Sequence, residues 1–350
     1  MKKLLALLLA ICMISVLAAC GTAAPEKTAA PETTASAAPA ASKLKLGMYI
    51  GTKLSGTDAK ADANGNAQTD STIAAVLVDE KGVIVDCILD IAQTKIAFTT
   101  TGEVLNKDAK VLTKRQLGDD YGMAKAATKG EWYVQAKGFC DYVIGKTAAE
   151  VKGIAVDDAG HATDEALLAT TTTKVGGYID AVVNACAASA DLGSKTGDKL
   201  GLGVTTDISG STDATAEADG SCYAYTHYCA VTVNAEQKVT AAVIDATQSK
   251  IGISTKGAIT TDLKTAEVIS KDVMKENYGL GAKSSIGAEW YQQAAGFCTY
   301  INGMTADKIG GIAIDDTGHA SDEALRATTT VHIGDFVKVA SEAISDGTSR

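Results

Sequence analysis

The sequence DDAGHATDEALLATTT over residues 157–172 returns as DDTGHASDEALRATTT over residues 315–330, and thirteen of the sixteen positions are identical. Chance does not produce such a match, so the chain is a tandem duplication. In each copy a polar loop leads into a run of threonines, and a helical pattern that opens on glycine follows. This repeated stretch, called the signature below, either joins parts of the fold or holds a ligand.

The duplication extends on both sides of the signature. It predicts a first repeat domain over residues 43–192 and a second over 199–346, joined by a short segment rich in Gly, Ser and Lys. Domains of about 150 residues are large enough to bury a sound hydrophobic core.

Both copies show the same order of expected elements. A β-hairpin is predicted from two apolar, β-branched runs around a polar turn, over residues 73–89 and again over 229–244. A helix is predicted where Trp, Ala, Phe and Cys recur at spacings of three to four, over 131–142 and 289–300. Such an aromatic stripe is typical of a core-facing helix, and flavin or quinone stacking is the alternative.

The threonine run of the signature favours a strand, and a closing helix follows it. The sequence therefore predicts an α+β fold of two tandem duplicated domains. Each is expected to hold a small antiparallel-rich sheet of four or five short strands with two or three helices.

The N-terminus indicates where the protein resides. Residues 1–20 have a basic start, an apolar run and a Leu-Ala-Ala-Cys ending, which resembles a bacterial lipoprotein signal peptide with lipidation at Cys20. Residues 21–42 are an Ala/Thr/Pro tether that is expected to be disordered. We expect the chain to be lipid-anchored on the extracytoplasmic face of the cell membrane.

Composition narrows the partners and the chemistry. The net charge is −10 and the basic residues are dispersed, which argues against nucleic acid. No CxxC motif is present, so the six cysteines after Cys20 are expected to be mostly small buried hydrophobes. Cys222 and Cys229 can form a disulfide only if a turn separates them.

Several polar groups are candidates for chemistry. Asp90, Gln93 and Lys95 have the counterparts Asp245, Gln248 and Lys250, and these groups either line a pocket at a strand end or tie down a sheet edge. His161 and His319 stand among carboxylates that either hold a divalent metal or cap turns. Asp- and Asn-containing segments at 62–66 and 217–220 favour plain turns over calcium loops.

The order of hairpin, acidic loop, threonine run and glycine-opened helix resembles the FMN-binding domain family of exported bacterial redox proteins. The resemblance implies FMN, esterified through its phosphate to Thr170 and Thr328. Asp164, Ala169, Asp322 and Ala327 match the family motif around these threonines. The sequence departs from that motif at the same two positions in each copy, with Leu167 and Leu168 in one and Leu325 and Arg326 in the other.

Three functions follow as hypotheses. The first is a tandem-repeat flavoprotein that carries FMN, covalent or noncovalent, for extracellular electron transfer to redox partners. The alternative is a non-redox lipoprotein that binds a solute or a surface polymer. The third is a metal-dependent enzyme at His161 and His319. Because no Gly-x-Ser-x-Gly or Ser-x-x-Lys motif occurs, we expect a carrier or binding protein rather than a hydrolase.

Overall fold

The computed structural model describes residues 41–350, which form one compact unit. The predicted signal peptide, the lipidation at Cys20 and nearly all of the tether lie outside these residues. Within residues 41–350 no helix combines the length and the apolar character needed to span a bilayer.

Each repeat opens with a three-stranded antiparallel sheet. The first sheet holds β1 (Lys45–Thr57), β2 (Gly65–Val78) and β3 (Ile84–Phe98), in that order. The second holds β4 (Lys199–Asp207), β5 (Gly220–Val233) and β6 (Val239–Ile253), in the equivalent order. The predicted hairpins are β2–β3 and β5–β6, and the α+β class is confirmed.

Helices and short turns follow each sheet. In the first repeat these are α1 (Lys114–Leu117), η1 (Gly118–Tyr121), η2 (Met123–Lys125), α2 (Trp132–Val143), α3 (Ala148–Lys152), α4 (Glu165–Leu168) and α5 (Gly176–Ala187). In the second they are α6 (Lys271–Met274), η3 (Lys275–Tyr278), α7 (Trp290–Tyr300), α8 (Ala306–Gly310), α9 (Glu323–Arg326) and α10 (Gly334–Ser349). The helices predicted from the aromatic stripes are α2 and α7.

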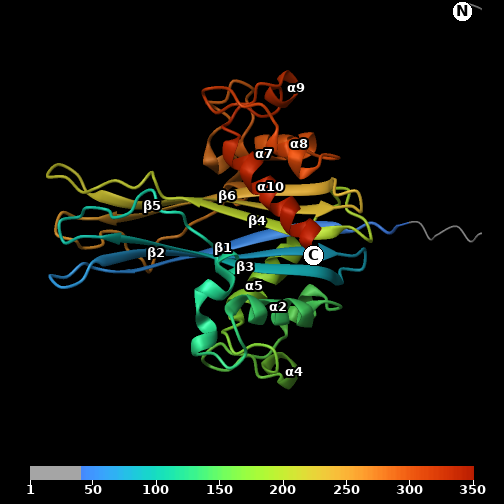
Figure 1. The fold of residues 1–350 in the computed structure, drawn as a ribbon, viewed down its shortest axis with the longest axis horizontal. Coiled ribbons are helices and arrows are strands. Elements are labelled where there is room, and N and C mark those ends of the chain that lie inside the picture. Colours follow the sequence, from blue (N-terminus) through green and yellow to red (C-terminus); the bar gives the residue numbers. More distant parts are fainter. Residues whose placement is uncertain (1–40) are drawn as a thin grey trace, which may run out of the picture. The chain divides into compact units, whose positions relative to one another are not determined.

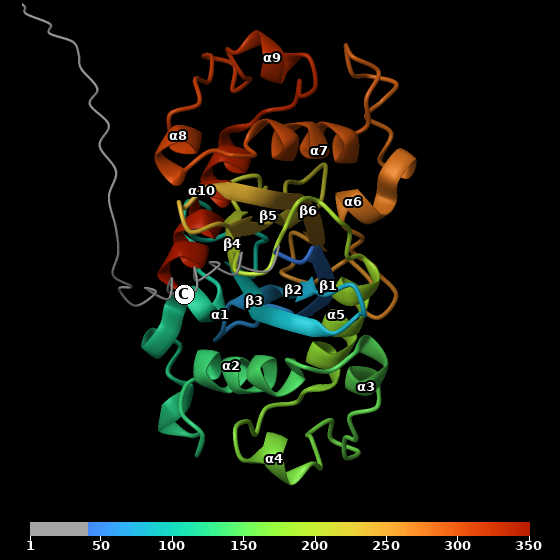
Figure 2. The ribbon, with the colours of Figure 1, turned by 90° about the vertical axis from the view of Figure 1, so that its right-hand side faces the viewer.

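The two repeats stack as four layers (Figures 1 and 2). The sheets pack face to face in the middle, α2 and α5 cover the outer face of one, and α7 and α10 cover the outer face of the other. Alternate side chains of β1 and β2 therefore enter different cores: Leu46 and Ile73 enter the core between the sheets, whereas Ala74 and Val76 enter the core under the helices. Burial on both faces explains the continuous apolar run of 73–78.

Close packing of β1 on α5 explains a retained glycine. A Cβ on Gly47 would lie 2.1 Å from the backbone oxygen of Ala185, and one on Gly201 would lie 2.0 Å from that of Ala343. Only glycine permits this approach between strand and helix.

Three expectations about strands were wrong. Each sheet has three long strands rather than four or five short ones. The threonine runs are not strands, because Thr171 and Thr329 follow single-turn helices and are held by polar contacts from α2 and α7. Asp90 and Asp245 lie inside β3 and β6 instead of at their ends.

The segments that follow β3 and β6 cross to the other repeat. Val111 forms an antiparallel bridge with Thr206 on β4, and residues 263–273 line the edge of β1. Each sheet therefore has an edge strand beside a segment of the partner repeat.

Candidate functional site

The signature is a structural junction in both repeats. The Asp164 carboxylate accepts a hydrogen bond from Leu167 N at 3.0 Å and caps α4, and Asp322 does the same for Leu325 N at 2.9 Å on α9. Leu167 and Leu325 are fully buried. Leu167 and Leu325, which depart from the flavin motif, are thus core residues that anchor the short helices, whereas Leu168 is exposed.

The candidate flavin-linked threonines are exposed. Thr170 Oγ1 donates to the carbonyl oxygen of Leu167 at 3.0 Å, and Thr328 Oγ1 donates to that of Leu325 at 3.2 Å. The neighbouring Ala169 and Ala327 end the single-turn helices as their C-caps. Because α4 and α9 lie at opposite outer ends of the layers (Figure 1), the two threonines do not form one joint site.

A buried glutamine holds the threonine run in each repeat. The Gln135 Oε1 atom accepts from the backbone N–H of Thr172 at 2.8 Å, and the Gln293 Oε1 atom accepts from that of Thr330 at 2.8 Å. Both glutamine side chains are fully buried. A polar group buried in this way is retained because its partners satisfy it.

The tryptophans of the aromatic stripes are core residues. Trp132 is 2% exposed and donates to Tyr178 OH at 2.8 Å, and Trp290 is 3% exposed. Neither ring offers a free face for flavin stacking, so the packing interpretation of the stripe is confirmed.

The histidine clusters serve as turns. The Asp157 carboxylate accepts backbone N–H groups of Ala159 and His161, and Asp315 accepts those of Thr317 and His319. These hydrogen bonds lower the pKa of Asp157, and the Thr317 hydroxyl and the backbone bonds lower that of Asp315 to about 2. Within residues 41–350 no group of three or more His, Cys, Asp or Glu side chains is placed to hold a metal ion.

The Asp and Gln positions of β3 and β6 make contacts within the fold, whereas Lys95 and Lys250 are exposed. Asp90 is buried and accepts from Thr113 Oγ1 at 2.6 Å and from Arg115 N at 3.1 Å, which holds α1 on the sheet. Asp245 accepts from Asp272 N at 2.9 Å, and burial raises its pKa to about 6. Gln93 donates to Asp70, and Gln248 donates to Tyr223 OH.

The six cysteines within residues 41–350 are all free, and five of them are buried. Cys222 and Cys229 lie on one continuous strand, β5, so no turn brings them together.

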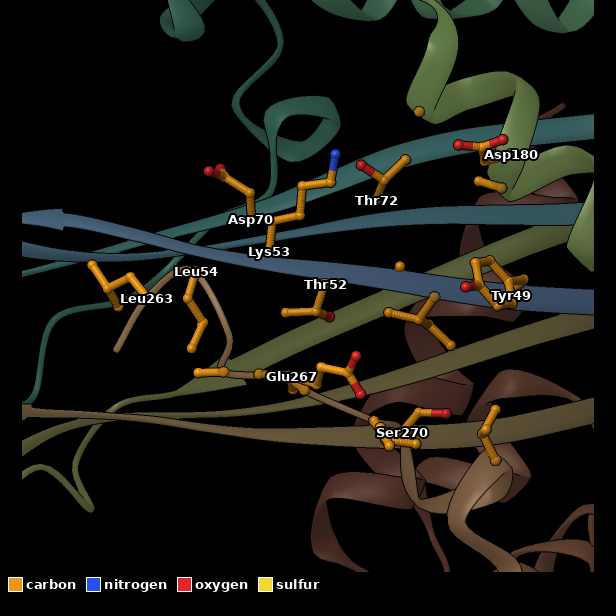
Figure 3. Close-up of a pocket in the computed structure, with 18 of the residues that line it drawn as sticks. Tyr49, Thr52, Lys53, Leu54, Asp70, Thr72, Asp180, Leu263, Glu267 and Ser270 are labelled. Atoms are coloured by element: carbon orange, nitrogen blue, oxygen red, sulfur yellow. The ribbon is translucent and has the colours of Figure 1, made fainter. Parts of the chain in front are cut away.

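The largest hollow among the described pockets is a groove of about 680 Å³ along the edge of β1. It lies between β1, the start of α5 and residues 263–273 of the second repeat, and is called the β1 groove here (Figure 3). Polar side chains line it together with an apolar rim in which Ile269 and Val273 are 48% and 59% exposed. Sequence reasoning did not find this groove, because its two walls come from different repeats.

The groove contains unequal charge. Asp70, Asp180 and Glu267 are its acidic residues, and Lys53 and Lys264 are its basic ones. In Figure 3 the side chains of Lys53, Asp70 and Thr72 extend on one side of the strands, while Glu267 and Ser270 lie across β1 from them. Ser270 is buried at the start of α6, beside the Asp245 carboxylate.

The equivalent edge of β4 is closed by a set of contacts that we call the clamp. Gln116 Nε2 donates to the carbonyl oxygen of Val204 at 2.9 Å, and Leu202 N donates to Asp346 Oδ2 at 2.9 Å. Arg115 forms a two-pronged ion pair with Asp346, with one contact at 2.9 Å. The clamp therefore binds α1 of one repeat to β4 and α10 of the other.

The β1 side lacks every clamp side chain. By position in the duplication, Asp272 replaces Arg115, Val273 replaces Gln116 and Ala188 replaces Asp346. None of these three residues can repeat the clamp contacts, because two are apolar and the third has the opposite charge. The groove is thus open at the edge where the clamp side chains are absent.

The floor of the groove also differs between repeats. Asp70 and Thr72 on β2 stand where β5 has Tyr225 and His227. The His227 ring is 4% exposed and lies 4.2 Å from the Tyr225 ring, centroid to centroid. The larger rings fill the position in the second repeat that shorter side chains leave open in the first.

A buried lysine completes this aromatic cluster of the second repeat. Lys271 is 4% exposed, donates to Tyr225 OH at 2.6 Å and lies over the rings of Tyr225, Tyr278 and Trp290. Burial lowers its pKa to about 8. The cluster is closed packing rather than an open site.

Comparisons of the chain with protein-family models, with curated proteins and with solved structures found no match.

Proposed function

We propose that this chain is an extracytoplasmic lipoprotein that binds a solute or a surface polymer in the β1 groove. One observation carries the proposal: the clamp is present on one edge, and all its side chains are absent from the equivalent positions on the other. Concave sites lined by apolar surface with a few polar groups are typical of ligand binding. The excess of carboxylates favours a ligand that carries positive charge.

The double variant Asp70→Tyr/Thr72→His tests the site, because it places the larger side chains of the second repeat on the groove floor. Melting temperatures are measured with a panel of amines, cationic amino acids, sugars and short peptides. We expect at least one compound to raise the melting temperature of the wild type but not that of the variant. Lys137→Gln, on the exposed side of α2, is the control and keeps the response. A panel that shifts both proteins equally contradicts the proposal.

The membrane anchor is part of the proposal and rests on the sequence of residues 1–20. Cys20→Ser is expected to release the protein from the membrane fraction of an exporting host, with loss of incorporated labelled fatty acid. Unchanged lipid labelling of the variant would exclude Cys20 as the acceptor.

A second candidate is flavin carriage at Thr170 and Thr328, with exchange of electrons with redox partners. It is favoured by the exposure of both threonine residues at the same place in each repeat. The surroundings fit FMN less well, since Asp164 and Glu165 are carboxylates that repel a phosphate and the nearby tryptophan ring is buried. An oxidised-flavin absorption band and a mass increase that Thr170→Ala/Thr328→Ala abolishes would support it. Colourless protein of unmodified mass from the native exporting host would refute it.

A further inference from the structure

We propose that the β1 groove takes an extended, basic peptide segment, which pairs with the free edge of β1 as an added strand. This inference rests on the proposed function and names the class of ligand. It is drawn from a comparison with the other half of the molecule, where the equivalent edge has hydrogen-bond partners within the chain.

The edge of β1 has unpaired backbone groups. Leu44 N and Leu46 N donate away from β2, to the carbonyl oxygens of Ser194 and Ala190. Because N–H and C=O groups alternate sides along a strand, Met48, Ile50 and Thr52 also point theirs away from β2. Among residues 41–350, no hydrogen bond from outside the sheet reaches the backbone of these three residues.

The β4 edge shows that the equivalent backbone groups take up hydrogen-bond partners. Leu202, Val204 and Thr206 are the counterparts of Met48, Ile50 and Thr52 in the strand registers. They are bound by Asp346, by Gln116 and by the bridge to Val111, respectively. Within residues 106–117, Val111 pairs with β4 through its backbone and Gln116 binds it through its side chain, while residues 106–109 form a turn and Lys114–Leu117 form α1.

The β1 groove offers a volume of about 680 Å³ beside the edge of β1. Its counterpart wall, residues 263–273, lines the groove, and Val268 forms no bridge with Thr52 among the described residues. Peptides that add a strand to a sheet edge gain affinity from backbone hydrogen bonds and specificity from side-chain pockets. The exposed Ile269 and Val273 provide apolar contact, and Asp70, Asp180 and Glu267 favour basic side chains.

The chain supplies the first probe. A synthetic peptide of residues 106–117, NKDAKVLTKRQL, has three lysines, one arginine and one aspartate, so its side chains carry a net charge of 4 − 1 = +3. Isotope-labelled protein is titrated with this peptide, and amide hydrogen exchange is followed along β1. We expect saturable binding with slower exchange at Met48, Ile50 and Thr52, and unchanged exchange at Leu202.

Two controls separate strand addition from charge attraction. The same peptide with N-methyl groups on alternate amides keeps its side chains but cannot pair, and it is expected to bind at least about tenfold more weakly. The triple variant Ala188→Asp/Asp272→Arg/Val273→Gln places the clamp side chains on the β1 edge and is expected to abolish binding. Its melting curve shows whether it remains folded, and Val273→Gln alone serves if it does not.

The possible results distinguish the inference from the proposed function. Equal binding of the two peptides, no binding of the unmodified peptide at millimolar concentration, or dimerisation of the protein through β1 would overturn the inference. If the peptide fails while a solute binds in the groove and is excluded by Asp70→Tyr/Thr72→His, the inference falls and the proposed function stands. If neither set of groove variants changes the binding of any ligand, both the inference and the proposed function are wrong.

Discussion

Replacing Gln135 by leucine tests whether the signature is a structural junction. The change removes the acceptor for Thr172 N at 2.8 Å and for Thr172 Oγ1 at 3.2 Å, and the donor to the carbonyl oxygen of Gly130 at 3.1 Å. Each partner left unpaired away from water costs about 1–3 kcal/mol. Two of these partners are backbone groups, so the loss is about 2–6 kcal/mol before any compensation.

Leucine returns part of this loss, because an apolar side chain replaces an amide at a fully buried position. Burying a leucine side chain contributes about 1.5–3 kcal/mol. The hydrogen bonds prevail, and we expect Gln135→Leu to lower the free energy of unfolding by about 1–3 kcal/mol. Gln293→Leu should have an effect at least as large, since Gln293 accepts from Thr330 N at 2.8 Å and also from Val331 N at 3.1 Å.

Urea denaturation followed by far-UV circular dichroism measures both variants. Lys137→Leu, at a position on α2 whose side chain is 70% exposed, is the matched control and should stay within about 0.5 kcal/mol of the wild type. Unchanged denaturation midpoints for both glutamine variants would refute the structural role of the signature. The threonine run would then be free to serve a ligand.

Three further predictions concern packing, pH and thiols. Gly138→Ala and Gly296→Ala should lower the melting temperature, although alanine has the better helix propensity. The added Cβ would lie 2.6 Å from the Cβ of Thr170 in one variant and 2.8 Å from that of Thr328 in the other. Gly177→Ala is the control, because its Cβ would have no other atom within 4 Å. Burial, together with the nearby charge of Lys271, lowers the pKa of His227 to about 3, although the Asp335 carboxylate lies 3.6 Å from its Nδ1 atom. Between about pH 6.5 and 3 the unfolded state therefore binds one more proton than the folded state, so this contribution to stability is present above pH 6.5 and is lost as pH falls. His227→Gln should lose less stability than the wild type between pH 7 and 4. An equal loss in both proteins would contradict the lowered pKa of His227. Cys186 is the one partly exposed thiol among the described cysteines, so a thiol reagent should label it before the others in native protein, and Cys186→Ser should remove that early label; early labelling at Cys87 or Cys140 would argue against the packing.

Sequence patterns predicted the strands and helices that are determined by neighbouring residues. The hairpin around residues 79–83 and the helix from Trp132 follow from β-branched runs, a polar turn and apolar spacing, and all are present. The threonine run misled for a physical reason: β-branched residues favour strands, yet Thr171 is fixed by a buried glutamine thirty-six residues away. Tertiary contacts of that kind override local propensity.

The β1 groove could not be predicted from the sequence for a different reason. Its walls, β1 and residues 263–273, belong to different repeats, and only the exchange of segments across the layers brings them together. The signal was nonetheless present in the alignment of the two copies. Arg115 against Asp272 and Gln116 against Val273 are differences where the repeats otherwise agree in structure.

A comparison of the two repeats therefore distinguishes structural positions from functional ones. Positions that both copies keep, such as Gln135 with Gln293 and Asp164 with Asp322, make the same contacts twice and hold each repeat together. Contacts that only one copy makes, such as the clamp, indicate where the functions of the two repeats differ.

An open sheet edge is a liability, because unpaired backbone groups invite association with other chains. On β4 the duplication shows a way to close such an edge with three side chains. On β1 the same positions leave it open, beside an apolar rim and an excess of carboxylates. An ancestor whose two edges were equivalent had either closure or access at both, and the present chain has one of each. The closed edge joins the repeats, which frees the open edge to receive a strand from another molecule.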